Sequence, residues 1–145
     1  MKFGIESIKN IMPEIIPLAK LHAKEVDIFS HALDVDWNEY IQSQADHNYI
    51  FFTVRDKGEL VGYAGYFGYF HLHHRNKIHA KLDVIFIEKQ NRGIGTRFIR
   101  YCESHLKKTG VNIISMGVPE NPKWGMLLDR MGYDKIEVVY AKELQ

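Results

Sequence analysis

The feature that most constrains this chain is an unbroken succession of a strand pattern, a glycine-containing loop and a helix pattern at residues 77–108. Apolar residues alternate along the strand pattern and then run consecutively from Val84 to Ile87, as in a strand covered on both faces. The polar loop that follows is Gln90-Asn91-Arg92-Gly93-Ile94-Gly95-Thr96. Residues 93–108 then show apolar side chains at helical spacing, followed by Gly110 as a helix stop. This succession predicts a sheet covered by helices.

Periodicity along the rest of the chain predicts the remaining elements. The predicted strands cover residues 3–8, 49–55, 60–70, 77–87, 111–116 and 133–142, and the predicted helices cover residues 12–26, a short stretch after the N-cap Asp36, and residues 93–108 and 121–131. The turn Asp56-Lys57-Gly58-Glu59 joins two of these strands in a hairpin. We therefore expect one mixed α/β (α+β) domain over residues 1–145, with helices on both faces of the sheet.

Composition limits the classes of protein to which this domain can belong. Lys+Arg 19 against Asp+Glu 18 leave a formal net charge of +1, which argues against a dedicated nucleic-acid binder or a polybasic membrane binder. Cys102 is the only cysteine, so the chain has no disulfide framework. No stretch approaches the ~20 apolar residues that cross a bilayer. We expect a cytoplasmic protein that binds neither nucleic acid nor membranes.

The loop at residues 90–96 has the properties of a phosphate site. Glycines at a helix entrance let a ligand approach the backbone, and the free N–H groups and the helix dipole favour an anion. Six basic residues and one acidic residue, Glu103, lie between residues 89 and 108. A Walker A loop needs Gly-Lys-Ser/Thr, which Gly95-Thr96-Arg97 does not provide, and a dinucleotide fingerprint needs a third glycine where Phe98 stands. A polyanion bound by another kind of loop is therefore expected.

The spacing Gln90-x-x-Gly93-x-Gly95 matches the pyrophosphate loop Gln/Arg-x-x-Gly-x-Gly/Ala of the Gcn5-related N-acetyltransferase (GNAT) superfamily. Residues 121–133 resemble a second segment of that family, Asn-x-x-Ala-x-x-Leu-Tyr-x-x-x-Gly-Phe, although Trp124 replaces the alanine and Leu128 the tyrosine. Leu60-Val61-Gly62 is similar to the family's third strand. The resemblance implies the GNAT fold, a mostly antiparallel mixed sheet of six to seven strands with helices on both faces.

The resemblance also implies an activity. Members of the family transfer an acetyl group from acetyl-CoA, a co-substrate, to a primary amine of a small molecule or protein by direct attack in a ternary complex. The glycine loop would bind the pyrophosphate, and backbone N–H groups of the fourth strand would hold the pantetheine arm and polarise the thioester carbonyl. The residues that the resemblance assigns to acetyl-CoA are Ile85, Phe86, Ile87, Gln90, Asn91, Arg92, Gly93, Ile94, Gly95, Thr96 and Asn121.

The acceptor amine must lose a proton before it attacks, because at pH 7 only about one lysine-like amine in ~2,500 is neutral. Asp83 is the first candidate for the general base, and His79, on the same strand face, is the second. The alternatives are that Asp83 pairs with a neighbouring basic residue and that His79 is an exposed strand residue. Leu128 cannot protonate the departing thiolate, so Tyr133, Tyr101 or water takes that role, or coenzyme A leaves as its anion.

Acceptor recognition is expected from Trp37 and Tyr40, which lie in the helix pair that forms one wall of the acceptor cleft in GNAT proteins, and from His73 at the hairpin end. For Trp37 the alternative is a core anchor. His73 belongs to the one histidine cluster, which also contains His71, His74 and His79. Because no carboxylate or cysteine stands at matching spacing, we expect no metal ion there.

Two functions from other classes stay open. Leu128 and Trp124 are compatible with a catalytically inactive GNAT-fold module that binds acyl-CoA or a partner. The basic helix at residues 93–108 is compatible with a nucleic-acid binder, whose affinity would fall steeply with salt. A monomer and a homodimer are both compatible with the sequence.

Overall fold

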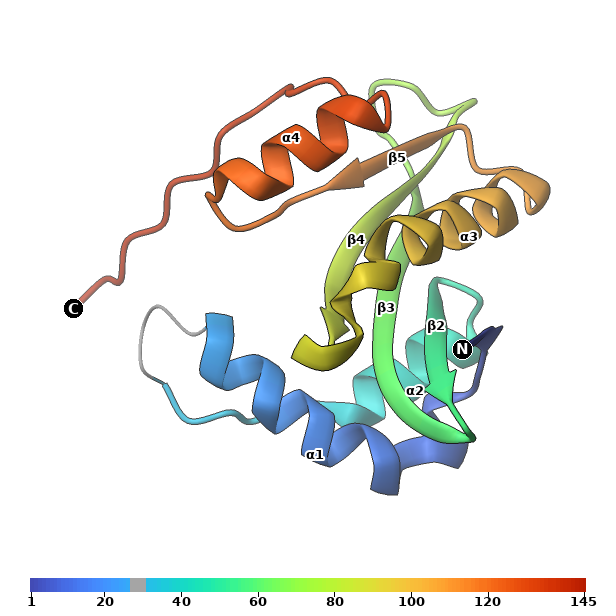
Figure 1. Ribbon diagram of the computed structural model, residues 1–145. Helices are drawn as coiled ribbons and strands as arrows, with labels where there is room; N and C mark the ends of the chain where they lie inside the picture. Colours follow the sequence, from blue (N-terminus) through green and yellow to red (C-terminus); the bar gives the residue numbers. More distant parts are fainter. Residues whose placement is uncertain (27–30) are drawn as a thin grey trace.

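A five-stranded sheet lies at the centre of the computed structural model, which describes residues 1–26 and 31–145 (Figure 1). Its strands are β1 (Lys2–Ile5), β2 (Tyr49–Asp56), β3 (Glu59–Phe70), β4 (Ile78–Ile87) and β5 (Ile113–Met116), and they lie side by side in chain order. Neighbouring strands are antiparallel except β4 and β5, which are parallel. A helix joins that pair, because parallel strands need a long crossover.

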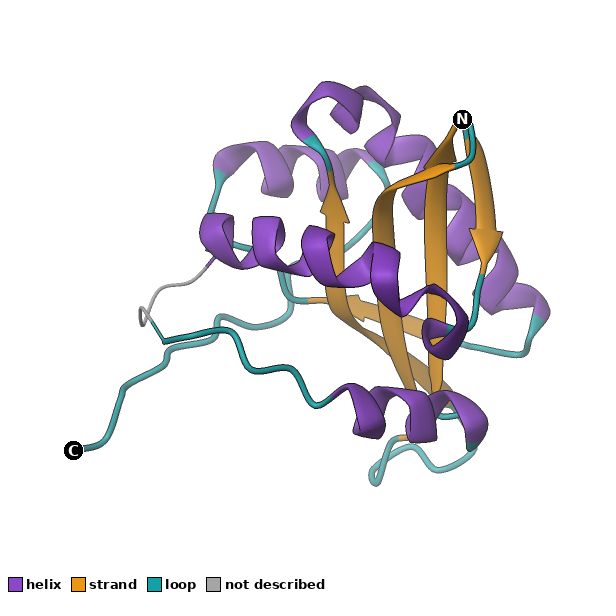
Figure 2. Cartoon of the chain, turned by 90° about the horizontal axis from the view of Figure 1, so that it is seen from below, coloured by secondary structure: helices purple, strands orange, loops and turns teal. Residues whose placement is uncertain are grey.

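Helices lie on both faces of the sheet (Figure 2). The helix α1 (Ile8–Val26) packs with α2 (Trp37–Ala45) on one hydrophobic core, and α3 (Gly95–Lys108) packs on the core of the opposite face. The 3-10 helix η1 (Lys89–Ile94) precedes α3, and α4 (Pro122–Arg130) buries none of its residues. The predicted mixed α/β fold class is confirmed. Among the helices of residues 1–26 and 31–145, none is long and apolar enough to span a bilayer.

Local sequence signals explain where several elements begin and end. The Asp36 carboxylate accepts the Glu39 N–H at 3.0 Å and caps α2, as predicted. In the β2–β3 hairpin, Lys57 and Gly58 have φ values of 50° and 88°, which a type I′ turn requires at its two central residues. The first helix begins earlier than predicted, at Ile8, because it continues through a kink ahead of its two prolines.

The predicted strand over residues 133–142 is wrong, and the sheet therefore has five strands instead of six to seven. Ile136, Val138 and Tyr140 alternate as in a strand, yet they are 79%, 58% and 92% exposed. An alternating segment forms a strand only where a neighbouring edge can pair with it. The strand at the available edge, β5, has only 4 residues, and the chain beyond α4 leads away from the sheet (Figure 1).

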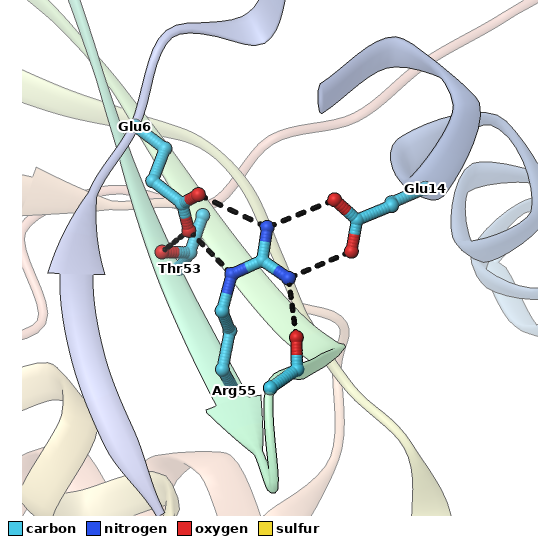
Figure 3. Close-up of polar contacts among 5 residues, drawn as sticks. Glu6, Glu14, Thr53 and Arg55 are labelled. Atoms are coloured by element: carbon cyan, nitrogen blue, oxygen red, sulfur yellow. Dashed lines mark hydrogen bonds and ion pairs between the residues drawn. The ribbon is translucent and has the colours of Figure 1, made fainter. Parts of the chain in front are cut away.

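Arg55 on β2 ties the first elements of the chain together (Figure 3). Its guanidinium donates to the Glu6 carboxylate at 2.9 and 3.0 Å, to the Glu14 carboxylate on α1 at 2.7 and 3.0 Å, and to the Gly58 carbonyl at 2.7 Å. The Thr53 hydroxyl also donates to Glu6. The hydrogen bonds from Arg55 lower the pKa of both carboxyl groups.

Arg55→Ala is expected to lower the free energy of unfolding by about 2 kcal/mol at pH 7, because hydrogen bonds to charged groups are stabilising even where they are partly exposed. The folded-state pKa of Glu6 lies below its ordinary value. This stabilisation is therefore complete above the ordinary pKa of about 4.3 and is lost as the pH falls through the lowered folded-state pKa.

Urea unfolding of both proteins at pH 7 and pH 3 measures this dependence. The difference in free energy of unfolding between the wild type and Arg55→Ala should shrink at pH 3. An equal difference at pH 7 and pH 3 would show that it does not come from the ionised Glu6 carboxylate. Arg130→Ala, on the exposed face of α4, is the matched control and should leave stability unchanged.

Candidate active site

Asp83 occupies a β-bulge in β4. The β3–β4 register pairs Gly65 with Val84 and Tyr66 with Leu82, which leaves Asp83 without an opposing residue. A bulge bends its strand and changes the direction of the side chain that it carries. Asp83 thereby reaches the residues of α2 and β2, on the sheet face that α1 and α2 cover.

Two tyrosines orient the Asp83 carboxylate. The hydroxyls of Tyr40 on α2 and Tyr49 on β2 both donate to Asp83 Oδ2, at 2.7 and 3.0 Å. Burial and the neighbouring Asp83 raise the pKa of both hydroxyls, so they stay protonated and act as donors. Asp83 itself is exposed to solvent. An oriented and accessible carboxylate can accept a proton, directly or through water.

His22 on α1 lies near this group, and the sequence analysis missed it. Its Nδ1 is 2.9 Å from the Tyr63 hydroxyl, and its ring stacks on Phe86 with 5.1 Å between centroids. Burial lowers the pKa of His22, so the imidazole is neutral at pH 7. The sequence does contain a pattern that points to His22. It continues the helical spacing of the buried Ile8, Ile11, Ile15 and Leu18 along α1, which places its side chain on the buried face.

A cavity of about 340 Å³ lies between α1, the segment at residues 31–37 and the sheet. The aromatic rings of Trp37, Tyr40, Tyr49 and Tyr63 are part of its wall. Val84, the residue after Asp83, also lines it. The cavity therefore opens beside the bulge, and Trp37 and Tyr40 both lie on the cavity wall, where the sequence predicted the acceptor.

The edge of β4 that faces β5 is only partly paired. The parallel ladder covers His79–Leu82 of β4, whereas β4 itself continues to Ile87. The Glu88 N–H donates to the Val61 carbonyl of β3, so by alternation the backbone groups of Ile85 and Ile87 point to the opposite edge. Within residues 1–26 and 31–145, the Ile85 N–H therefore has no partner strand. It lies two residues beyond Asp83, where an extended ligand can bind the backbone.

The glycine loop forms η1 and the first turn of α3. A Cβ atom placed on Gly93 would meet no atom within 4 Å, and one on Gly95 would meet only Ile87 Cδ1 at 4.0 Å. Ile94, the N-cap of α3, forms no side-chain capping bond. The Gly95 N–H donates to the Arg92 carbonyl, but the space beside both glycines is open, and the positive end of a helix favours an anion such as a phosphate group. Thr96 lies in the same first turn.

Side chains of the loop are held by neighbouring elements. Arg92 donates through Nη2 to Glu25 on α1 at 2.5 Å and through Nε to the Ile87 carbonyl at 2.9 Å. Gln90 donates to the Glu88 carboxylate at 2.8 Å, and the Asn91 N–H donates to the Glu88 carbonyl. The loop is thereby connected to the end of α1, close to His22.

Two predicted residues lie apart from Asp83. Asn121 is the exposed N-cap of α4, where its side chain accepts the Lys123 N–H. The Tyr133 hydroxyl donates to Glu103 of α3 at 2.6 Å, and burial raises its pKa. Tyr133 thus lies on the α3 side of the sheet, opposite to the face that carries Asp83. Its predicted role as an acid stays a prediction.

His79 lies on β4 four residues before Asp83, about 13 Å along an extended strand. Its side chain is 8% exposed, and its Nε2 has no hydrogen-bond partner among residues 1–26 and 31–145. His71 lies against it with 4.9 Å between ring centroids, and the His73 N–H donates to His71 Nδ1. No three His, Cys, Asp or Glu side chains within residues 1–26 and 31–145 are arranged to hold a metal ion.

Comparison with known proteins identifies the family of this chain. The Acetyltransferase (GNAT) family profile matches residues 17–133. None of the curated proteins matches the chain.

Solved structures share the fold at low sequence identity. An aminoglycoside acetyltransferase from an uncultured soil metagenomic sample, in complex with sisomicin, has a TM-score of 0.76 and 15% identity, with 99% of this chain and 96% of that chain covered. The ribosomal-protein-alanine N-acetyltransferase of Brucella melitensis biovar Abortus 2308 has a TM-score of 0.73 and 16% identity, with 99% and 100% covered. A possible acetyltransferase from Clostridium difficile 630 has a TM-score of 0.76 and 16% identity, with 99% and 97% covered.

These structures show the fold alone, whereas the family match spans more than half of the chain and confirms the resemblance seen in the sequence. This protein therefore belongs to the GNAT family of acetyltransferases.

Proposed function

We propose that this protein transfers an acetyl group from acetyl-CoA to a primary amine, in a ternary complex of the enzyme and both substrates. The observation that carries the proposal is Asp83 in the β4 bulge, held by the hydroxyls of Tyr40 and Tyr49 next to the unpaired edge of β4. An amine needs a proton acceptor and a thioester needs hydrogen-bond donors, and this location offers both.

The donor side of the site uses backbone groups. The backbone N–H groups that the loop from Gly93 to Thr96 leaves free bind the pyrophosphate, and the Ile85 N–H binds the thioester carbonyl oxygen. A preorganised donor at that oxygen stabilises the negative charge that develops there. Support comes from the open space at both loop glycines and from the end of the β4–β5 ladder at Leu82.

On the acceptor side, Asp83 takes a proton from the ammonium group, directly or through water. The neutral nitrogen then bonds to the thioester carbonyl carbon, the carbon–sulfur bond breaks, and coenzyme A leaves with that electron pair as its thiolate. The second proton that the nitrogen loses on becoming an amide passes to water or to the departing thiolate. A positioned general base contributes about 10²–10⁴-fold to such a step. The neutral His22, hydrogen-bonded to Tyr63, supplies a second polar group in the same region.

The leaving group needs no strong acid, because a thiol pKa of about 8.5 makes the thiolate a tolerable leaving group. Leu128 cannot donate a proton, and Tyr133 would first have to release Glu103. Leu128 also favours the second candidate function, a GNAT-fold module that binds acyl-CoA without turning it over.

Coenzyme A release separates the two candidates. We expect the purified protein, given acetyl-CoA and a panel of primary amines, to release free thiol at least about tenfold faster with one of these amines than without amine. The single cysteine does not disturb a thiol assay, because Cys102 is fully buried and burial raises its pKa. Acetyl-CoA binding without amine-dependent release would favour the inactive module.

A further inference from the structure

We propose that the acceptor is a small amine with one positive charge on an apolar body, bound in the cavity between α1 and the sheet. This inference rests on the proposed acetyl transfer and adds to it the chemical class of the acceptor. It starts from the cavity wall, which differs from what a polar or polycationic acceptor requires.

The wall is mostly aliphatic and aromatic. On the α1 side it includes Ile15, Ala19 and Ala23, and on the sheet side it includes Phe51 and Val84. At about 340 Å³ the cavity lies at the lower end of the roughly 300–1,000 Å³ range of small-molecule pockets. A compact apolar body gains free energy there by leaving water, whereas a folded polypeptide surface has no place in it.

The carboxylate beside the cavity is that of Asp83, which precedes the lining residue Val84. Tyr40 and Tyr49 line the cavity with the same side chains whose hydroxyls hold Asp83. Among the lining residues that the structure describes, Asp34 is the one carboxylate, and it lies on the segment at residues 31–37. His22 is neutral at pH 7 because burial lowers its pKa.

One ammonium group can thus bind beside Tyr40 and Tyr49, near Asp83. There the cation–π attraction of the tyrosine rings adds to the electrostatic attraction of the carboxylate. A second ammonium group beside Asp34, which is exposed to solvent, would stay hydrated and gain little, and any further ammonium group would be buried against the apolar wall without a partner. The cavity therefore selects for a single charge.

The test compares kcat/KM across amines with acetyl-CoA as donor. We expect 2-phenylethylamine to exceed kanamycin and spermidine by at least about 100-fold, and kcat/KM to rise about fourfold per methylene from butylamine to hexylamine. Turnover of kanamycin, spermidine or an alanine-terminated peptide in preference to the apolar amines would overturn the acceptor assignment and leave acetyl transfer intact. A rate that rises with the acyl chain of the donor instead of with the amine would also overturn it.

A cavity variant and a binding measurement complete the test. Ala19→Phe fills the cavity and should raise KM for 2-phenylethylamine by about tenfold. The KM for acetyl-CoA should stay within twofold of the wild-type value. Leu21→Phe, on the same helix but 47% exposed, is the matched control and should change neither value. Calorimetric titration of 2-phenylethylamine into the wild-type complex with coenzyme A reports the cavity without chemistry. Binding without turnover would contradict the proposed function alone, and no binding at millimolar amine would overturn this inference.

Discussion

Asp83→Asn is expected to lower kcat/KM for amine acetylation by about 100-fold or more at pH 7, the contribution of a positioned general base. Asparagine keeps an oxygen that can accept the hydroxyls of Tyr40 and Tyr49, so the fold and the bulge should persist. The loss should be largest at low pH, where nearly all of the amine is protonated. It should shrink as the pH approaches the amine pKa of about 10.4, because the substrate then loses its proton to solvent.

A pH profile of kcat/KM from 6 to 10 measures this difference. Asp129→Asn, an exposed residue of α4, is the matched control and should follow the wild-type profile. An Asp83→Asn profile parallel to that of the wild type would remove Asp83 from proton transfer. A large loss in His22→Gln with an unchanged Asp83→Asn profile would transfer the role to the imidazole that Tyr63 orients.

The position of Asp83 could be anticipated in part. The apolar run that follows it marked the end of a covered strand, and alternation placed it on one face with His79. The bulge could not be anticipated, because it depends on how β3 and β4 share their register around Gly65 and Tyr66. The bulge brings the carboxylate to Tyr40 and Tyr49, so the hydrogen-bonded group itself is a tertiary feature.

Strand periodicity predicts on which face of the sheet a side chain lies, but it does not predict which side chain will be its hydrogen-bond partner. Tyr49 and Tyr63 lie in strands that were predicted correctly, yet nothing local distinguishes them from core aromatics such as Phe51. Tyr40 and Trp37 were expected at the acceptor side because of their helix pair, and they do line the cavity. His22 could have been found, since a polar residue on an otherwise buried helix stripe requires a partner.

The error at the end of the chain has a related cause. Residues 133–142 alternate as a strand does, but alternation predicts a face and cannot supply a neighbouring edge. The apolar side chains of Ile136 and Val139 therefore stay exposed by 79% each. In contrast, the hairpin of β2 and β3 was predicted closely, because its turn residues Lys57 and Gly58 encode the connection locally.

Gly93→Glu is expected to weaken acetyl-CoA binding by about 100- to 1,000-fold, since a carboxylate about 4 Å from a phosphate charge costs about 4 kcal/mol at an effective dielectric constant of 20. The structure makes this variant informative. A side chain at Gly93 meets no atom within 4 Å, and its φ lies outside the left-handed region, so the substitution should leave folding intact. Gly95→Glu should act in the same way, with only Ile87 Cδ1 at 4.0 Å to accommodate.

Calorimetric titration with acetyl-CoA measures the effect, and two variants separate its causes. Gly93→Gln has the same bulk without the charge and should lose less affinity than Gly93→Glu. Gly68→Glu, which would place a carboxylate on β3 with only the His79 carbonyl at 4.0 Å, should bind as the wild type does. If Gly93→Glu and Gly95→Glu both kept wild-type affinity, the loop could not be the pyrophosphate site. Because η1 connects the end of β4 to α3, acetyl-CoA would then have to reach Asp83 from another direction.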